Sequence, residues 1–184
     1  MQKSSSFRGA SLAKKLAFTA LFAALCCVGT LVVVIPLPAS GYFNTGDVFV
    51  LLAGWFLGPI YGSIAAALGS ALADVFSGFL IYAPATFVIK GLTAFLAYLL
   101  YACLKKHAQK TLRQVLFRSV CALCAEAVMV LGYFLFESVL YGFVGAIPNI
   151  LGNTLQGVCC SVLAVTLATL LYPIKTVRNL FPTL

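Results

Sequence analysis

Residues 14–38 read KKLAFTALFAALCCVGTLVVVIPLP, and this stretch determines the class of fold. Between its two lysines and Pro36 lie twenty residues, 16–35, none of which is charged. A helix rises about 1.5 Å per residue, so a run of this length crosses the roughly 30 Å hydrocarbon core of a bilayer. The stretch therefore predicts a membrane-spanning helix that ends at the prolines.

A secretory signal peptide is the alternative interpretation of this stretch. Lys14 and Lys15 precede the apolar run, and Ala39-Ser40-Gly41 could serve as a cleavage site. The apolar run is longer than the roughly 7 to 15 residues usual in a signal peptide. We therefore expect the helix to be retained.

The composition of the whole chain is that of a membrane protein. Of its 184 residues, 62% are hydrophobic and 9% are charged, whereas about a quarter of the residues in soluble domains are charged. The net charge of +8 does not indicate a nucleic-acid surface, because the basic residues stand at the ends of apolar runs rather than among aromatics on one solvated face.

Eleven of the twelve Lys and Arg residues occur in three clusters, and only Lys90 stands apart. The clusters comprise Lys3, Arg8, Lys14 and Lys15; Lys105, Lys106, Lys110, Arg113 and Arg118; and Lys175 and Arg178. The positive-inside rule places all three in the cytoplasm, so the chain must cross the membrane an even number of times between them. The expected helices cover residues 16–35, 47–57, 60–79, 85–104, 115–140 and 148–172.

The predicted fold is an all-α integral membrane protein, a bundle of six transmembrane helices with both termini in the cytoplasm. We expect one domain, 1–184, with an N-terminal tail at 1–12, a basic loop at 105–114 and a C-terminal tail at 173–184. Asp47 is expected to cap the second helix, and Gly58-Pro59 to end it.

Small residues recur at four-residue spacing on two of the expected helices. The first carries Ala13 and Ala17, then Ala20 and Ala24, and the third carries Ala65, Gly69 and Ala73. In lipid such stripes let helix backbones approach closely. Packing within the chain is one interpretation, and for the first helix a docking face for another membrane subunit is the other.

The few polar residues inside the apolar segments share one depth. At a rise of about 1.5 Å per residue, five of them lie roughly 5 to 12 Å below the outer helix ends: Asp74, Lys90, Glu137, Asn153 and Gln156. Charged groups in a membrane usually face a protein interior or an aqueous cavity. We therefore expect a pocket open to the outside; the alternative is a structural ion pair of Asp74 with Lys90.

Other residues are candidates for the rim and lining of this pocket. Asn44 and Asp47, in the first external loop, are expected to close over it, and three aromatic residues are candidates for stacking on a ring: Trp55, Tyr82 and Tyr133. Taken singly, each aromatic residue fits an interfacial or core position better than a stacking role. Glu126 lies deeper and is expected outside the pocket, paired with Arg118 or facing a partner subunit.

No catalytic or metal-binding motif is present in the sequence. Gly58-Pro-Ile-Tyr-Gly62 lacks the Lys-Ser/Thr of a P-loop, and Cys121 and Cys124 have no second pair or nearby histidine. We expect neither an enzyme nor a metal site. A stand-alone secondary transporter or channel with Asp74, Lys90 and Glu137 as an ion path is the alternative, but it would require more polar residues in the inner half.

Seven short motifs follow one another along the chain. They are Tyr42-Phe-Asn-Thr-Gly-Asp47, Gly58-Pro-Ile-Tyr-Gly62, Gly69-Ser-Ala-Leu-Ala-Asp74, Tyr82-Ala-Pro-Ala-Thr86, Ile89-Lys-Gly91, Gly132-Tyr-Phe-Leu-Phe-Glu137 and Ile147-Pro-Asn-Ile-Leu-Gly-Asn153 with Gln156. Together with the length, the six expected spans and the alanines of the first helix, their order resembles the substrate-binding S components of energy-coupling factor (ECF) vitamin transporters of bacteria.

The resemblance implies a multi-pass protein of the bacterial plasma membrane that captures a vitamin or vitamin precursor from outside. Its partners would be a transmembrane coupling (T) subunit and two cytoplasmic ABC-type ATPases, which use ATP, while this chain binds no cofactor. The family's alanine motif, which contacts the T subunit, corresponds to Ala20 and Ala24, or less closely to Ala13 and Ala17. The first external loop would act as a lid, and the S component would topple in the membrane to release its ligand.

The implied substrates are riboflavin, hydroxymethylpyrimidine and pyridoxine-like compounds, all flat heterocycles with polar edges. The closeness of the charged groups slightly favours the smaller rings. The residues expected to bind substrate are Asn44, Asp47, Asp74, Tyr82, Lys90, Tyr133, Glu137, Asn153 and Gln156.

Overall fold

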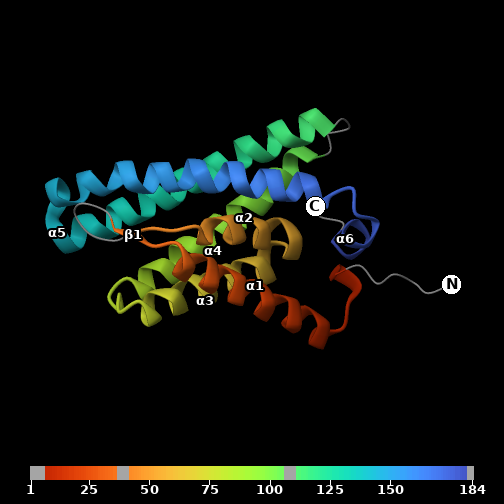
Figure 1. Cartoon of the computed structure of the whole chain (residues 1–184), viewed down its shortest axis with the longest axis horizontal. Coiled ribbons are helices and arrows are strands. Elements are labelled where there is room, and N and C mark those ends of the chain that lie inside the picture. Colours follow the sequence, from red (N-terminus) through yellow and green to blue (C-terminus); the bar gives the residue numbers. More distant parts are fainter. Residues whose placement is uncertain (1–6, 37–41, 106–110, 182–184) are drawn as a thin grey trace.

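Helices make up almost all of the fold, as the apolar runs predict (Figure 1). The structure is a computed structural model that describes residues 7–36, 42–105 and 111–181; the candidate cleavage site at 39–41 lies outside them. Its helices are α1 (Leu12–Val32), α2 (Gly46–Leu57), α3 (Pro59–Phe76), α4 (Ala83–Leu104), α5 (Thr111–Leu171) and α6 (Lys175–Leu180), after a 3-10 turn at Phe7–Gly9. Two short strands, β1 (Ile35–Pro36) and β2 (Tyr42–Phe43), pair antiparallel.

The longest helix, α5, contains the fifth and sixth expected spans. Gly142 interrupts it with φ 78° and ψ 159°, outside the helical region. A residue with positive φ is strained unless it is glycine, so this position suits Gly142. In Figure 1 the chain runs from green to cyan, turns, and returns in blue beside itself. The break therefore lies at Gly142, and Pro148 is inside the second half of α5.

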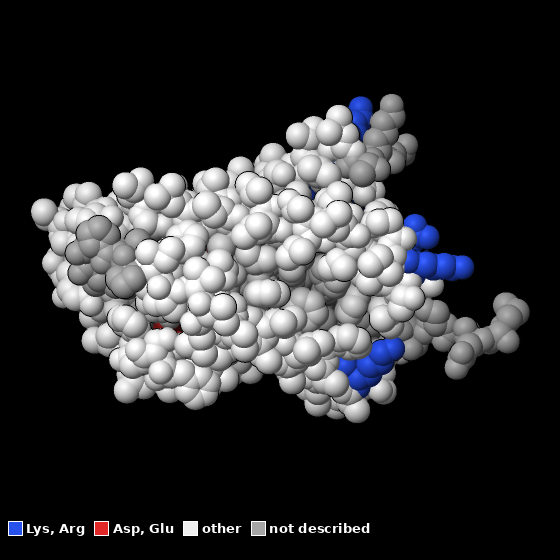
Figure 2. Space-filling view, viewed as in Figure 1, with Lys and Arg blue, Asp and Glu red and all other residues white. Residues whose placement is uncertain are grey.

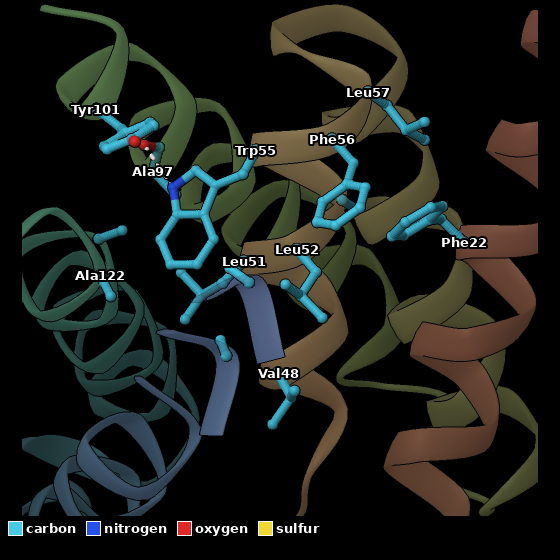
Figure 3. Packing of buried hydrophobic residues seen from close by; sticks show 14 of the residues in the cluster. Phe22, Val48, Leu51, Leu52, Trp55, Phe56, Leu57, Ala97, Tyr101 and Ala122 are labelled. Carbon is cyan, nitrogen blue, oxygen red and sulfur yellow. Dashed lines mark hydrogen bonds between the residues drawn. The ribbon is translucent and has the colours of Figure 1, made fainter. Parts of the chain in front are cut away.

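Four helices are long and apolar enough to cross a membrane in the described part of the chain: α1, α3, α4 and α5. By contrast, α2 has 12 residues, or about 18 Å of helix. All of them except Phe49 are buried. Helix α2 is thus a core element that contacts α1, α3, α4 and α5, and Figure 3 shows its Trp55, Phe56 and Leu57 among neighbouring side chains.

The small-residue stripe of α3 serves packing inside the chain. Ala65 and Ala73 are fully buried, and a Cβ added at Gly69 would lie 2.2 Å from the carbonyl oxygen of Ala23 in α1. This close backbone approach is what small residues permit in lipid. The alanines of α1 differ, because Ala20 and Ala24 are both exposed.

The charges divide the molecule along its length. On the face shown in Figure 2, the blue Lys and Arg side chains gather at one end. Both marked termini in Figure 1 lie toward that same end. We call it the basic end, and the opposite end, at the turn of α5, the distal end.

Candidate functional site

A cavity in the distal half of the bundle brings together residues from all the long helices. It is lined by Thr30, Tyr42, Asn44, Ser70, Asp74, Phe79, Tyr82, Thr86, Lys90, Tyr133, Glu137, Asn153 and Gln156. Eight of the nine predicted site residues are among them. The ninth, Asp47, does not line the cavity but contacts Lys90, which does. In this conformation water can enter about 40 Å³ of it, enough for about three molecules.

A buried ion pair forms one wall of the cavity. The Nζ atom of Lys90 lies 2.5 Å from Oδ1 of Asp47, and the exposed fractions of these side chains are 5% and 0%. The second carboxylate oxygen of Asp47 accepts a hydrogen bond from Nε2 of Gln156 at 2.6 Å. Asp47 thereby joins α2 to α4 and to the second half of α5.

This pairing corrects two predictions about Asp47. It does not cap α2, whose N-cap is Thr45, and it is a buried residue of the first turn rather than a residue of the external loop. The alternative of an Asp74–Lys90 ion pair is wrong, because α2 inserts Asp47 between α4 and α5, where its carboxylate pairs with the Lys90 ammonium group.

The segment from Tyr42 to Asn44 lines the cavity and bonds across it. The hydroxyl of Tyr42 donates to Oδ1 of Asp74 at 2.8 Å, and the backbone N–H of Asn44 donates to Oε1 of Gln156 at 2.8 Å. Burial, and then the nearby Asp74, raises the pKa of Tyr42, so this hydroxyl keeps its proton. We call these two hydrogen bonds the latches.

Aromatic rings line the cavity beside the charged groups. Lys90 Nζ lies 5.2 Å from the ring centroid of Tyr133, whose hydroxyl is 3.0 Å from Oγ1 of Thr86. The hydroxyl of Tyr82 donates to Glu137 at 3.4 Å. Trp55, however, is not in the cavity: it is fully buried in the core and donates to the carbonyl of Ala97 at 3.1 Å (Figure 3).

Three residues that line the cavity each carry a buried polar atom with no hydrogen-bond partner among the described residues. The atoms are Oγ of Ser70, Oδ2 of Asp74 and Oε2 of Glu137. An unsatisfied buried polar group costs about 1 to 3 kcal/mol. A bound molecule that carries hydrogen-bond donors can satisfy these acceptors and the one hydroxyl.

Sequence reasoning missed five lining residues: Thr30, Tyr42, Ser70, Phe79 and Thr86. Two of them carried a usable signal, since Ser70 stands four residues before Asp74 and Thr86 four before Lys90, on the same helix faces. Thr30 carried no such sequence signal. In the structure its hydroxyl donates to the carbonyl oxygen of Cys26 in its own helix.

Glu126 and Arg118 are both buried but do not pair. The two carboxylate oxygens of Glu126 have no hydrogen-bond partner in the part of the chain that the structure describes. Glu126 lines a separate cavity between the halves of α5, outside the distal one, as predicted. Arg118 instead stacks on Tyr101 and Tyr172.

Comparison with known proteins gives consistent matches. Residues 11–173 match the family model described as ECF-type riboflavin transporter, S component. An uncharacterized protein in a gap 3′ region of Pyrococcus woesei is 37% identical over 132 residues, which is 71% of this chain and 83% of that protein.

Two solved structures share the fold. The S component of a bacterial ECF transporter has a TM-score of 0.67 at 22% identity, covering 89% of this chain and 98% of that one. The S component for biotin from an ECF-type ABC transporter has a TM-score of 0.53 at 18% identity, covering 84% and 90%. At these identities the likeness shows the fold alone.

Proposed function

Since this chain belongs to the family of S components of ECF-type riboflavin transporters, we propose that its distal cavity captures a flat vitamin or vitamin precursor from outside the cell. Family membership and the apolar helices make it a multi-pass membrane protein and a vitamin-binding transporter subunit, and not an enzyme. The single observation that carries the proposal is that three residues lining one cavity, Ser70, Asp74 and Glu137, each carry a buried polar atom without a hydrogen-bond partner in the described part of the chain.

The topology that fits this role has six crossings in a single domain. The full-length crossings are α1, α3, α4 and the two halves of α5, the short buried α2 carries the chain back through the protein core to the start of α3, and both termini are cytoplasmic. The gathering of Lys and Arg at the basic end supports this orientation under the positive-inside rule (Figure 2). The distal cavity then faces the outside, in the plasma membrane of a bacterium.

The ligand class is a heterocycle with donors on its edge: hydroxymethylpyrimidine, a pyridoxine-like compound or riboflavin. The family description names riboflavin, which makes it the first compound to test. The small space beside close charges favours the smaller rings. In either case Asp74 and Glu137 accept hydrogen bonds from the ligand, Tyr82 or Tyr133 stacks on its ring, and Asn153 and Gln156 contribute amide groups. Asp47 positions Lys90.

Ligand entry requires the segment around Tyr42 and Asn44 to move. The space of about 40 Å³ is well below the roughly 300 Å³ at the lower end of ligand pockets. Breaking both latches frees Asp74 and Gln156, so the residues that hold the cavity closed become available to the ligand. This segment is the lid of the site.

Transport needs partners that supply energy. We propose a transmembrane T subunit and two cytoplasmic ABC-type ATPases, which use ATP, while this chain binds no cofactor itself. Ala20 and Ala24 are exposed on α1, and small exposed residues allow another helix to approach closely in lipid. This face is the docking surface for the T subunit.

Native mass spectrometry of the detergent-purified chain tests the capture function. We expect a co-purifying vitamin or precursor, or a one-to-one adduct after riboflavin, pyridoxine or hydroxymethylpyrimidine is added. An empty protein that binds none of the three contradicts the proposal. Uptake by the purified chain alone in proteoliposomes would instead support a stand-alone transporter.

A further inference from the structure

A second buried cation, Arg118, lies toward the basic end, in the first half of α5. It is 1% exposed. Its guanidinium carbon lies 4.9 Å from the ring centroid of Tyr101 and 5.5 Å from that of Tyr172. Such cation–π contacts offset part of the cost of burying the charge. The Tyr101 hydroxyl also hydrogen-bonds to the guanidinium group, but neither ring supplies a carboxylate or carbonyl acceptor, and Nε and Nη2 have no hydrogen-bond partner among residues 7–36, 42–105 and 111–181.

The chain has no acidic side chain beside Arg118. Its four acidic residues are Asp47, Asp74, Glu126 and Glu137. The nearest along α5 is Glu126, eight residues or about 12 Å further on, and it lines a different cavity. A buried charge without a counter-ion is strongly destabilising. We therefore expect Arg118 to bind an anion that is not part of this chain.

A cavity of about 150 Å³ adjoins Arg118. The beginning of α5 and the end of its second half enclose it with Gln114, Val115, Arg118, Thr169, Tyr172 and Pro173. The Thr169 hydroxyl already donates to the carbonyl oxygen of Val165 at 2.7 Å, so the donors come from Arg118, whose guanidinium group binds phosphate through paired N–H groups. The lining thus has the chemistry of a phosphate site.

The surroundings of this cavity are apolar where they face lipid. In the helical turns next to it, four side chains are 46 to 70% exposed: Leu112, Leu116, Leu170 and Ile174. An exposed cation, Lys175, follows Ile174 in the same region. Basic pockets between transmembrane helices on the cytoplasmic side bind acidic lipid headgroups. An acyl chain can cover the leucines while the headgroup reaches Arg118.

We propose that this cavity binds the phosphate of an anionic phospholipid, and that Arg118 is the main residue contacting that phosphate. The lipid supplies the negative charge that the chain lacks at this place, and its acyl chains lie on the exposed leucines. The site is separate from the distal cavity and does not depend on the identity of the vitamin.

Native mass spectrometry of delipidated protein, with phosphatidylglycerol or phosphatidylcholine added, tests this inference. We expect a one-to-one phosphatidylglycerol adduct on the wild type and at least tenfold less on Arg118→Gln. Arg113→Gln is the matched control, because it removes the same charge from an exposed position of the same helix; it should keep the adduct.

A second variant keeps the test valid should Arg118→Gln fail to fold. Thr169→Phe fills the cavity but leaves the guanidinium group in place, and it should also lose the adduct. Equal adducts on Arg118→Gln and Arg113→Gln, or equal binding of phosphatidylcholine to the wild type, would overturn the proposal. Thermal stabilisation by millimolar inorganic phosphate as large as that by the lipid would overturn the assignment to a lipid.

Discussion

Replacing Lys90 by methionine should destabilise the bundle strongly. The substitution keeps most of the side-chain volume but removes the ammonium group that lies 2.5 Å from Asp47 Oδ1. Asp47 is fully buried, so water cannot replace the lost partner, and only the Gln156 amide still bonds to its carboxylate.

The size of the effect follows from the burial of both partners. Removing one member of a buried ion pair costs about 3 to 5 kcal/mol, whereas replacing both by apolar residues is often neutral or stabilising. We therefore expect Lys90→Met to lose about 3 to 5 kcal/mol of unfolding free energy. The double variant Lys90→Met with Asp47→Leu should recover most of that loss.

Equilibrium unfolding in mixed micelles measures these changes. Trp55 is the only tryptophan and lies on α2, two turns from Asp47, so its fluorescence reports on the helix that carries the ion pair. Lys175→Met, an exposed lysine at the basic end, is the control and should change stability by less than about 0.5 kcal/mol. A Lys90→Met protein within 1 kcal/mol of wild type, or a double variant as unstable as the single one, would refute the reasoning.

Three further substitutions test other parts of the structure. Asp74→Asn should weaken vitamin binding by about 10- to 100-fold in calorimetry, because an amide cannot accept hydrogen bonds at both positions; unchanged affinity would leave Asp74 a structural partner of Tyr42. Ala24→Trp should abolish co-purification with the T subunit and ATPases while vitamin binding survives, and loss of both would indicate internal packing. Glu126→Leu should raise unfolding free energy by about 1 to 3 kcal/mol, since it removes two buried oxygens that have no partner among the described residues; a lower stability would mean that Glu126 interacts favourably with its surroundings.

The helices could be predicted because a bilayer imposes their length and their lack of charge. The predicted span at 85–104 agrees with α4 (Ala83–Leu104) within two residues. The predicted third helix extended to Phe79 but ends at Phe76, because the chain turns there through Gly78, whose φ is positive. Element ends depend on such local turns, which apolar periodicity does not specify.

The gathering of polar residues could also be predicted, but their pairing could not. Depth along separate helices places Asp74, Lys90 and Glu137 at one level without knowledge of the fold. The partner of Lys90 depends on how α2 inserts between α4 and α5. Helix α2 is apolar on every side, so its sequence gives no face that would orient Asp47 or Trp55 in advance.

The two latches have a consequence for selectivity. A molecule that binds only the open form has an apparent affinity equal to its intrinsic affinity multiplied by the fraction of open molecules. Every solute bears the same reduction, but only one that engages both Asp74 and Gln156 regains what the latches supplied. A small fragment of the vitamin that reaches only one of them bears the full reduction but regains only part of what the latches supplied.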